Sequence, residues 1–272
     1  MKLTKSIALL ALTSSLGAQA ASTSTTTLSN IYQQLKESPL SMSVLTETAS
    51  ARGMDGFQNT SIMYLGYKLT DKDSLKLESR VLFDRRTGKE DTRMNRMVLS
   101  YNRGKILTQD KHGINMSAKL EQRLYPNPTD RNARNQYGLT RASVKVSHEF
   151  NSLFSMSATL FGAKTQRMNK ADPDTTDTYA YASFVENFQI NDKWYVAFVQ
   201  EPFISRNVDG SQGGANIYSA LETGYQLTPE LLGAVYTANT LENDDGKKLS
   251  IRNFGKATKG QEYAFYFMLS AF

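Results

Sequence analysis

Charged residues of opposite sign alternate along two segments of the chain. Residues 76–80 read Lys-Leu-Glu-Ser-Arg, and residues 119–123 read Lys-Leu-Glu-Gln-Arg. Because side chains two residues apart point the same way from an extended chain, each segment would present a cation, an acid and a second cation on one face. Such a face can bind and orient charged solutes, or its charges can pair into an internal network. The chemistry open to these residues is therefore electrostatic.

Candidates for acid–base or metal chemistry are few. The chain has no cysteine and two histidines, His112 and His148, and neither histidine has an evident nucleophile partner in the sequence. A carboxylate site could use Glu186, Glu201 and Glu222, but no pattern singles them out. The loop acids of residues 172–177 and 242–245 do not follow the alternating ligand pattern of a calcium loop. We therefore predict no enzyme, no cofactor, no metal site and no nucleic-acid partner.

The elements that would position the charges are extended strands. Apolar and polar side chains alternate with a period of two between residues 74 and 167, as in Leu75 and Leu77 against Lys76 and Glu78. This period indicates a strand with one apolar and one polar face, and it is not a helical period.

Short polar turns recur along the chain roughly 40 residues apart, and longer loops lie between them. The predicted short turns are residues 70–73, 109–113, 151–152, 191–192 and 228–230. The predicted long loops are residues 52–60, 85–93, 126–136, 169–177, 207–215 and 241–260. Because Asn, Asp, Gly and Pro tolerate turn geometry, the pattern predicts about twelve strands joined by alternating short and long connections.

The chain is predicted to comprise three parts. Residues 1–20 have the layout of a cleavable export signal, with two lysines, a short apolar run and a small-residue exit. Residues 21–39 would form a tether with a short helix, because apolar residues recur there at helical spacing before Pro39. Residues 40–272 would form the strands, and the last strand ends on the aromatic residue Phe272.

A flat apolar strand at the end of the chain would be an aggregation template unless another strand paired with it. Pairing the last strand with the first, which begins near Leu40, would close the sheet into a barrel. Closed barrels and helices are the structures that satisfy their backbone groups within a bilayer. The export signal, the alternating strands and the terminal segment Tyr266–Phe272 resemble those of bacterial outer-membrane β-barrel proteins.

The resemblance implies an all-β fold, a transmembrane antiparallel up-and-down β-barrel over residues 40–272. It also implies a location in the cell outer membrane, contact with outer-membrane lipid, and recognition of Phe272 by the barrel assembly machinery. The short turns would face the periplasm and the long loops the exterior.

Aromatic residues gather toward both ends of the predicted strands. Those near the short turns are Tyr67, Phe150, Phe154, Phe188, Trp194, Tyr195, Tyr225 and Phe272. Those near the long loops are Phe83, Tyr125, Tyr137, Tyr179, Phe203, Tyr218 and Tyr236. Two such bands are typical of interfacial girdles, in which amphipathic rings lie between lipid and water.

About twelve strands would enclose an intermediate bore, so the inward face decides what the barrel does. The predicted inward cations are Lys68, Lys76, Arg80, Arg96, Lys119, Arg123, Arg141 and Lys145, and the predicted inward acids are Glu47, Glu78, Glu121 and Glu149. Later strands would present Ser155, Ser157, Thr159, Thr165, Asn187 and Gln189. A basic wall opposite a polar, uncharged wall would favour small anions.

These features predict a porin-like channel for passive diffusion of small, preferentially anionic solutes. One alternative is a closed structural or adhesive barrel, because the interleaved acids and bases could pair into a network that fills the interior. A second, weaker alternative is a lipid-modifying enzyme, although both histidines are expected near short turns.

Overall fold

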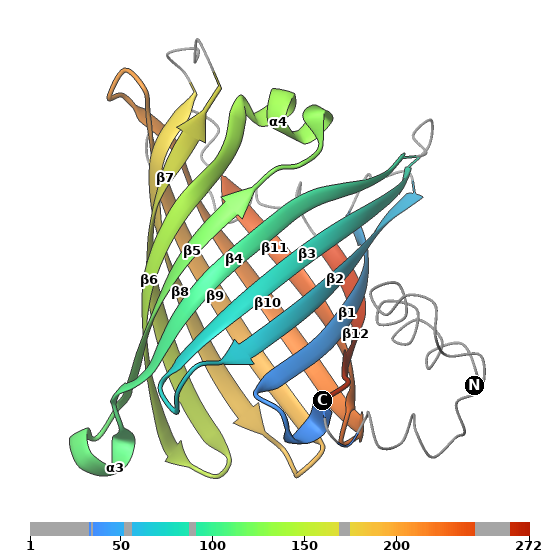
Figure 1. Ribbon diagram of the computed structural model, residues 1–272, viewed down its shortest axis with the longest axis vertical. Coiled ribbons are helices and arrows are strands. Elements are labelled where there is room, and N and C mark those ends of the chain that lie inside the picture. The colour runs from blue at the N-terminus through green and yellow to red at the C-terminus, as the bar shows by residue number, and fades with distance from the viewer. Residues whose placement is uncertain (1–32, 34, 52–55, 87–90, 169–174, 243–261) are drawn as a thin grey trace.

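The chain folds into a closed antiparallel β-barrel (Figure 1). The computed structural model describes residues 33, 35–51, 56–86, 91–168, 175–242 and 262–272. The strands within these residues are β1 (Leu40–Ala51), β2 (Gly56–Lys68), β3 (Asp73–Arg86), β4 (Asp91–Leu107), β5 (Asn115–Leu124), β6 (Gln136–Asn151), β7 (Phe154–Arg167), β8 (Thr176–Gln189), β9 (Trp194–Asn207), β10 (Gln212–Thr228), β11 (Leu231–Glu242) and β12 (Glu262–Ser270). Each strand pairs with its neighbours in sequence, which confirms the predicted up-and-down barrel.

The barrel closes through the pairing of β1 with β12. Their register runs from Ser43 opposite Ser270 to Ala51 opposite Glu262. Beyond the strand, the Met42 amide donates to the Phe272 carbonyl at 3.0 Å, and the Ala271 amide donates to the Met42 carbonyl at 2.8 Å. The predicted pairing of the last strand with the one that begins at Leu40 is therefore confirmed.

Short and long connections alternate at opposite ends of the barrel, as predicted (Figure 1). Asn151 closes one short turn, because its side-chain oxygen accepts from the Leu153 and Phe154 amides at 2.8 and 2.9 Å. Asn191 closes another in the same way. Thr70 and Thr228 each accept from two backbone amides in two further short turns. Side chains that capture turn amides thus fix where these strands reverse.

Two short helices occupy connections that the sequence predicts only as turn or loop. Helix α3 (Gln109–His112) lies between β4 and β5 and ends at Gly113, whose φ of 76° suits glycine. Helix α4 (Pro128–Arg134) lies between β5 and β6 at the opposite end of the barrel. Asn127 caps α4 by accepting from the Thr129 amide at 2.8 Å.

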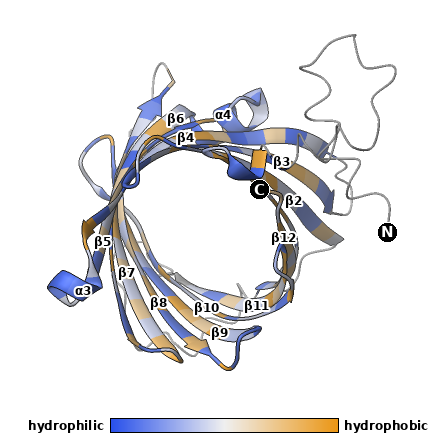
Figure 2. Ribbon diagram, turned by 60° about the horizontal axis from the view of Figure 1, so that its bottom comes forward, coloured by the Kyte–Doolittle hydropathy of each residue, from blue (hydrophilic) through white to orange (hydrophobic). Residues whose placement is uncertain are grey.

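The barrel is inverted in polarity relative to a water-soluble protein. Some acidic side chains on its inner face are buried, and Asp84 and Glu121 are 2% and 6% exposed. Leucines on its outer face are open, and Leu99 and Leu160 are 55% and 64% exposed. Figure 2 shows the resulting alternation of polar and apolar residues along the strands. An apolar outer surface of this kind is stable in lipid and not in water.

The N-terminal parts are described only in their last residues. Residues 33 and 35–37 are helical and precede β1, while most of the predicted helix and the predicted signal of residues 1–20 lie outside the described residues. No helix within the described part of the chain is both long and apolar enough to span a bilayer.

The predicted aromatic bands are confirmed in part, and the register places Phe83 of the long-loop band on the outer face. On the outer face near the short turns, the rings of Phe150, Phe154 and Phe188 stack in sequence at 5.2 and 4.7 Å, and Trp194 packs against Tyr225 at 5.1 Å. The prediction is wrong for Tyr195, Tyr179, Phe203, Tyr218 and Tyr236, which the register places on the inner face. These rings lie toward the strand ends, as the prediction required, but their side chains point into the lumen and not toward lipid.

Candidate functional site

The inner face is identified by contacts that pass over intervening strands. The Tyr195 and Tyr266 hydroxyls are 3.2 Å apart, although β10 and β11 lie between their strands. Side chains can meet in this way only across the concave side of a curved sheet. The register can be followed from these two tyrosines around the barrel. It then assigns each remaining paired residue to the inner or the outer face.

The register places all the predicted charged residues on this inner face. On β3 to β6 these are Lys76, Glu78, Arg80, Arg96, Lys119, Glu121, Arg123, Arg141, Lys145 and Glu149, with Lys68 on β2 and Glu47 on β1. Two acids and a cation that the sequence reasoning did not assign join them, Asp84, Asp91 and Arg93. We call the inward side chains of β3 to β6 the basic wall.

Arginines on the basic wall bind glutamates of neighbouring strands. Arg96 donates to Glu78 through Nη2 at 2.5 Å and through Nε at 3.1 Å. Arg141 donates to Glu121 and to the Tyr181 hydroxyl, and Lys119 is 3.1 Å from Glu121. The two glutamates are thereby surrounded by more cations than they can neutralise.

Some cations of the basic wall keep unused hydrogen-bonding capacity. The buried Nε atoms of Arg80 and Arg123 have no hydrogen-bond partner within the described residues. Arg80 Nε lies 3.9 Å from Glu78, too far for a hydrogen bond, and Arg123 forms no ion pair there. Lys76 lies over the Tyr64 ring at 3.9 Å from its centroid. The charges of Arg80 and Arg123 are thus the least neutralised by acids of the basic wall, and they can attract an anion in the lumen.

The opposite side of the lumen has a different composition. The inward residues of β7 and β8 include Ser155, Ser157, Thr159, Thr165, Asn187 and Gln189, as predicted. Beyond them, the described residues of β9 to β12 and β1 place Glu201, Glu222, Glu262 and Glu47 on the inner face and no lysine or arginine there; Arg206 of β9 is on the outer face. We call these strands' inward side chains the acidic wall. The prediction of an uncharged wall therefore holds for these residues of β7 and β8 and is wrong for β9 to β12, and Arg167 at the end of β7 pairs with Asp177 of β8 at 3.2 Å.

Tyrosines hold the carboxylates of the acidic wall. Glu222 accepts from the Tyr195 hydroxyl at 2.6 Å and from the Tyr266 hydroxyl at 2.9 Å. Glu262 accepts from the Tyr236 hydroxyl at 2.9 Å. Because these donors are neutral, they satisfy the carboxylates without cancelling their negative charge.

Small residues make room for the tyrosines. Tyr195 lies opposite Gly224 in the register, and a Cβ atom on Gly224 would fall 2.2 Å from the Tyr195 ring. Tyr236 lies opposite Ala264, and Tyr266 lies opposite Ala234. The two alanines are only 7% and 6% exposed, although they face the lumen. This large-beside-small pairing lets each ring lie flat along the wall, so that its hydroxyl reaches a glutamate.

The sequence candidates for catalysis do not meet in the structure. His148 Nδ1 lies 2.6 Å from the Gly113 carbonyl at the short-turn end, and His112 contacts its own helix at Thr108. Glu186 is on the outer face, opposite Met156, whereas Glu201 and Glu222 are on the inner face. Among the described residues no group of three His, Asp or Glu side chains could hold a metal ion. Much of both acidic loop segments lies outside these residues.

A closed barrel of twelve strands with a charged interior and an apolar exterior is the architecture of bacterial outer-membrane β-barrel proteins. The NanC porin is similar to this chain with a TM-score of 0.54 and 9% sequence identity, over 83% of this chain and 98% of the porin. An outer membrane channel from Pseudomonas putida F1 is similar with a TM-score of 0.56 and 10% identity, over 86% of this chain and 96% of the channel. No protein-family model and no curated protein matches the sequence. The likeness is one of fold, and it identifies no subfamily.

Proposed function

We propose that this protein is an outer-membrane channel for passive diffusion of small polar solutes, with a preference for those that carry a carboxylate or phosphate group. An outer-membrane location is supported by the apolar outer face and by the likeness to a porin and an outer membrane channel. The proposed role is transport without catalysis.

The observation that carries the proposal is the direction of the ion pairs. Within the described residues, each ion pair of the basic wall joins side chains of the same strand or of adjacent strands, such as Arg96 with Glu78 and Lys119 with Glu121, apart from the bond of Arg93 to Asp130 in α4. None of these ion pairs joins the basic wall to the acidic wall. A filled, closed barrel would be expected to pair its charges across the interior, whereas this network runs along the wall.

Selectivity would follow from the field between the two walls. Cations on one side of a narrow, low-dielectric pore and acids on the other orient any dipolar solute that passes. The preference for anions is expected from Arg80 and Arg123, because within the described residues no carboxylate lies within hydrogen-bond distance of either guanidinium group.

The test is conductance of the purified protein in a planar bilayer under a KCl gradient. We expect resolvable channels with a reversal potential on the anion-selective side. Replacing Arg80 and Arg123 by glutamine should lower the anion-to-cation permeability ratio about fivefold, which corresponds to about 1 kcal/mol for two partly exposed charges.

The matched control is Arg80→Lys with Arg123→Lys, which preserves charge and should preserve most of the selectivity. Absence of any channel in well-folded protein would favour the closed barrel. Cation preference in the wild type, or an unchanged ratio in the glutamine variant, would contradict the anion preference.

A further inference from the structure

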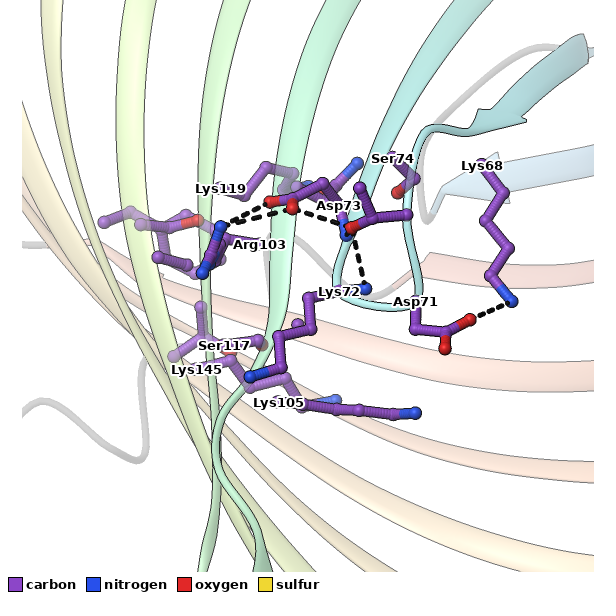
Figure 3. A pocket seen from close by; sticks show the side chains of 17 residues that line it. Lys68, Asp71, Lys72, Asp73, Ser74, Arg103, Lys105, Ser117, Lys119 and Lys145 are labelled. Carbon is purple, nitrogen blue, oxygen red and sulfur yellow. Dashed lines mark hydrogen bonds and ion pairs between the residues drawn. The ribbon is translucent and has the colours of Figure 1, made fainter. Parts of the chain in front are cut away.

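A cavity of about 600 Å³ opens at the short-turn mouth of the barrel (Figure 3). It lies between the turn that joins β2 to β3 and the inner side of β4 to β7. Its lining contains six cationic side chains, Lys68, Lys72, Arg103, Lys105, Lys119 and Lys145. The remaining polar lining includes Ser117, Ser143 and Thr159.

The two acids in this lining are both occupied. Asp71 is 3.0 Å from Lys68, and Asp73 is 3.1 Å from Arg103. The hydrogen bond from Lys68 holds the pKa of Asp71 below its usual value, so that this turn carboxylate is ionised at neutral pH. Figure 3 shows Asp71 joined to Lys68 and Asp73 joined to Arg103.

Three further lysines of the cavity lie outside these ion pairs, although the charge of Lys105 also contributes to the lowered pKa of Asp71. Lys72, Lys105 and Lys145 form no ion pair within the part of the chain that the structure describes. Three like charges around one concave site raise the free energy of the empty site, and they attract anions from solution. The cavity therefore has an excess of positive charge that its own residues do not neutralise.

The backbone conformation of Lys105 is a separate observation that points to the same site. Its φ is 50°, a left-handed conformation that is uncommon for a lysine and that glycine or asparagine adopts more easily. The register of β4 against β5 slips between Arg103 and Leu107, and the Gly104 amide donates to the Lys72 carbonyl at 2.6 Å. Bulges at barrel rims often redirect a side chain toward a functional site.

The bulge brings Lys105 to the other lysines. Lys105 and Lys145 also line a second, smaller cavity of about 220 Å³ together with Asn115, Ser117 and Ser147. The two cavities thus share two of the unpaired lysines, and Lys105 lies where the cavities meet. A flexible ammonium group in this position can follow an anion from one cavity to the other.

We propose that the cavity at the short-turn mouth is a binding site for small solutes that carry two or more anionic groups, with Lys72, Lys105 and Lys145 as its principal ligands. Lysine suits such a ligand because its ammonium is a compact charge that binds phosphate and carboxylate oxygens without a fixed fork geometry. The inference rests on the proposed channel for its role, as a station at the periplasmic entrance, but binding can be measured without conduction.

The test is titration calorimetry of the full chain in detergent, with inorganic pyrophosphate as the probe at constant ionic strength. We expect saturable binding with one ligand per chain. The variant Lys72→Gln/Lys105→Gln/Lys145→Gln should bind roughly 10- to 100-fold more weakly, as expected for the loss of three charge-assisted contacts at a solvated site.

The control variant removes the same charge elsewhere at this end of the barrel. Lys36→Gln/Lys111→Gln/Lys193→Gln changes three lysines that line neither cavity, and it should bind pyrophosphate like the wild type. Electrophoretic mobility of the unheated samples checks that all variants remain folded barrels. Loss of binding in both triple variants to the same degree, or no binding by the wild type, would overturn the site.

Two further measurements separate the site from its alternatives. Competition with a short-chain anionic phospholipid distinguishes a soluble ligand from a lipid headgroup, and stronger binding of the lipid than of pyrophosphate would overturn the proposal. Bilayer recording distinguishes the site from the channel. Channels without pyrophosphate binding would contradict the site alone, and pyrophosphate binding without channels would contradict the channel alone.

Discussion

The two walls of the lumen use the same strand alternation to hold carboxylates in opposite ways. On the basic wall, Glu78 and Glu121 accept from arginines, and further cations surround each pair. On the acidic wall, Glu222 and Glu262 accept from tyrosine hydroxyls. Both arrangements satisfy buried oxygens, but only the second leaves the negative charge uncancelled.

The difference teaches that hydrogen bonding and charge neutralisation are separate design choices on one surface. Arginine partners neutralise the charge of a glutamate, which then serves to hold the arginines in place. Tyrosine partners leave the glutamate charged, so that it remains a source of negative potential. The separation of charge across the lumen therefore depends on which residues bind the glutamates and not only on how many glutamates there are.

The largest expected effect comes from removing a glutamate that has charged partners. Glu121→Ala would leave Arg141 buried without its carboxylate, and Arg141 is only 12% exposed. We expect a loss of about 3–5 kcal/mol in the free energy of unfolding, measured by urea titration in detergent or lipid. Adding Arg141→Met should restore part of this loss, and Glu149→Ala, which changes an exposed glutamate on the same inner face, should cost little. A loss in Glu121→Ala no larger than in Glu149→Ala would refute the pairing.

A smaller effect is expected from removing a glutamate that has neutral partners. Glu222→Ala leaves two tyrosine hydroxyls, which can turn to lumen water more readily than a buried guanidinium. We expect a loss of about 1–3 kcal/mol in the same titration. Equal losses in Glu222→Ala and Glu121→Ala would show that the two walls do not differ in the way described.

A third effect tests the packing that aims the tyrosines. Gly224→Ala places a Cβ atom against the Tyr195 ring, which must rotate away and release Glu222. We expect a loss of about 1–3 kcal/mol, as for other overpacked sites. The double variant Gly224→Ala/Tyr195→Ala removes the clash, so it should be no less stable than Tyr195→Ala alone. A single variant as stable as the wild type would mean that the ring has free space on another side.

The smallest effect concerns selectivity alone. Glu201→Gln/Glu222→Gln keeps side chains that can accept from the tyrosines while removing two negative charges from the acidic wall. We expect the anion-to-cation permeability ratio to rise about twofold to fivefold, in line with about 0.5–1 kcal/mol for partly exposed charges. The outward-facing Glu186→Gln serves as the control. An unchanged ratio would place these glutamates outside the conducting path, and a fall would contradict their proposed effect on selectivity.

Sequence reasoning predicted the architecture well because its signals are local. Asn151, Asn191 and Thr228 bind the amides of their own turns, so the chain reversals are encoded where they occur. The alternation of Lys76, Glu78 and Arg80 likewise needed no knowledge of neighbouring strands. The basic wall followed directly from those local patterns.

The acidic wall was missed because its tyrosines resemble girdle residues in the sequence. Tyr218 and Tyr236 stand near strand ends, where aromatic rings often meet lipid, and only the strand register shows that they face inward. Bulges add a second difficulty, because they exchange the two faces part-way along a strand. Simple alternation along β4 would place Arg93 and Arg96 on opposite faces. The register shift opposite Arg80 and Val81 places both of them on the inner face. The left-handed conformation of Lys105 likewise interrupts the strand alternation, and no residue pattern in the sequence predicts it.

The pairing of β1 with β12 has a consequence for assembly. Each of the other pairings joins strands that follow one another in the chain, so their loop-closure entropy is small and they can form as successive hairpins. The remaining seam brings together residues more than two hundred positions apart, from Ser43 opposite Ser270 to Ala51 opposite Glu262. We therefore expect β1 and β12 to pair last during folding. Amide hydrogen exchange at Val44 to Ser50 should then report their separation as the first step of barrel opening.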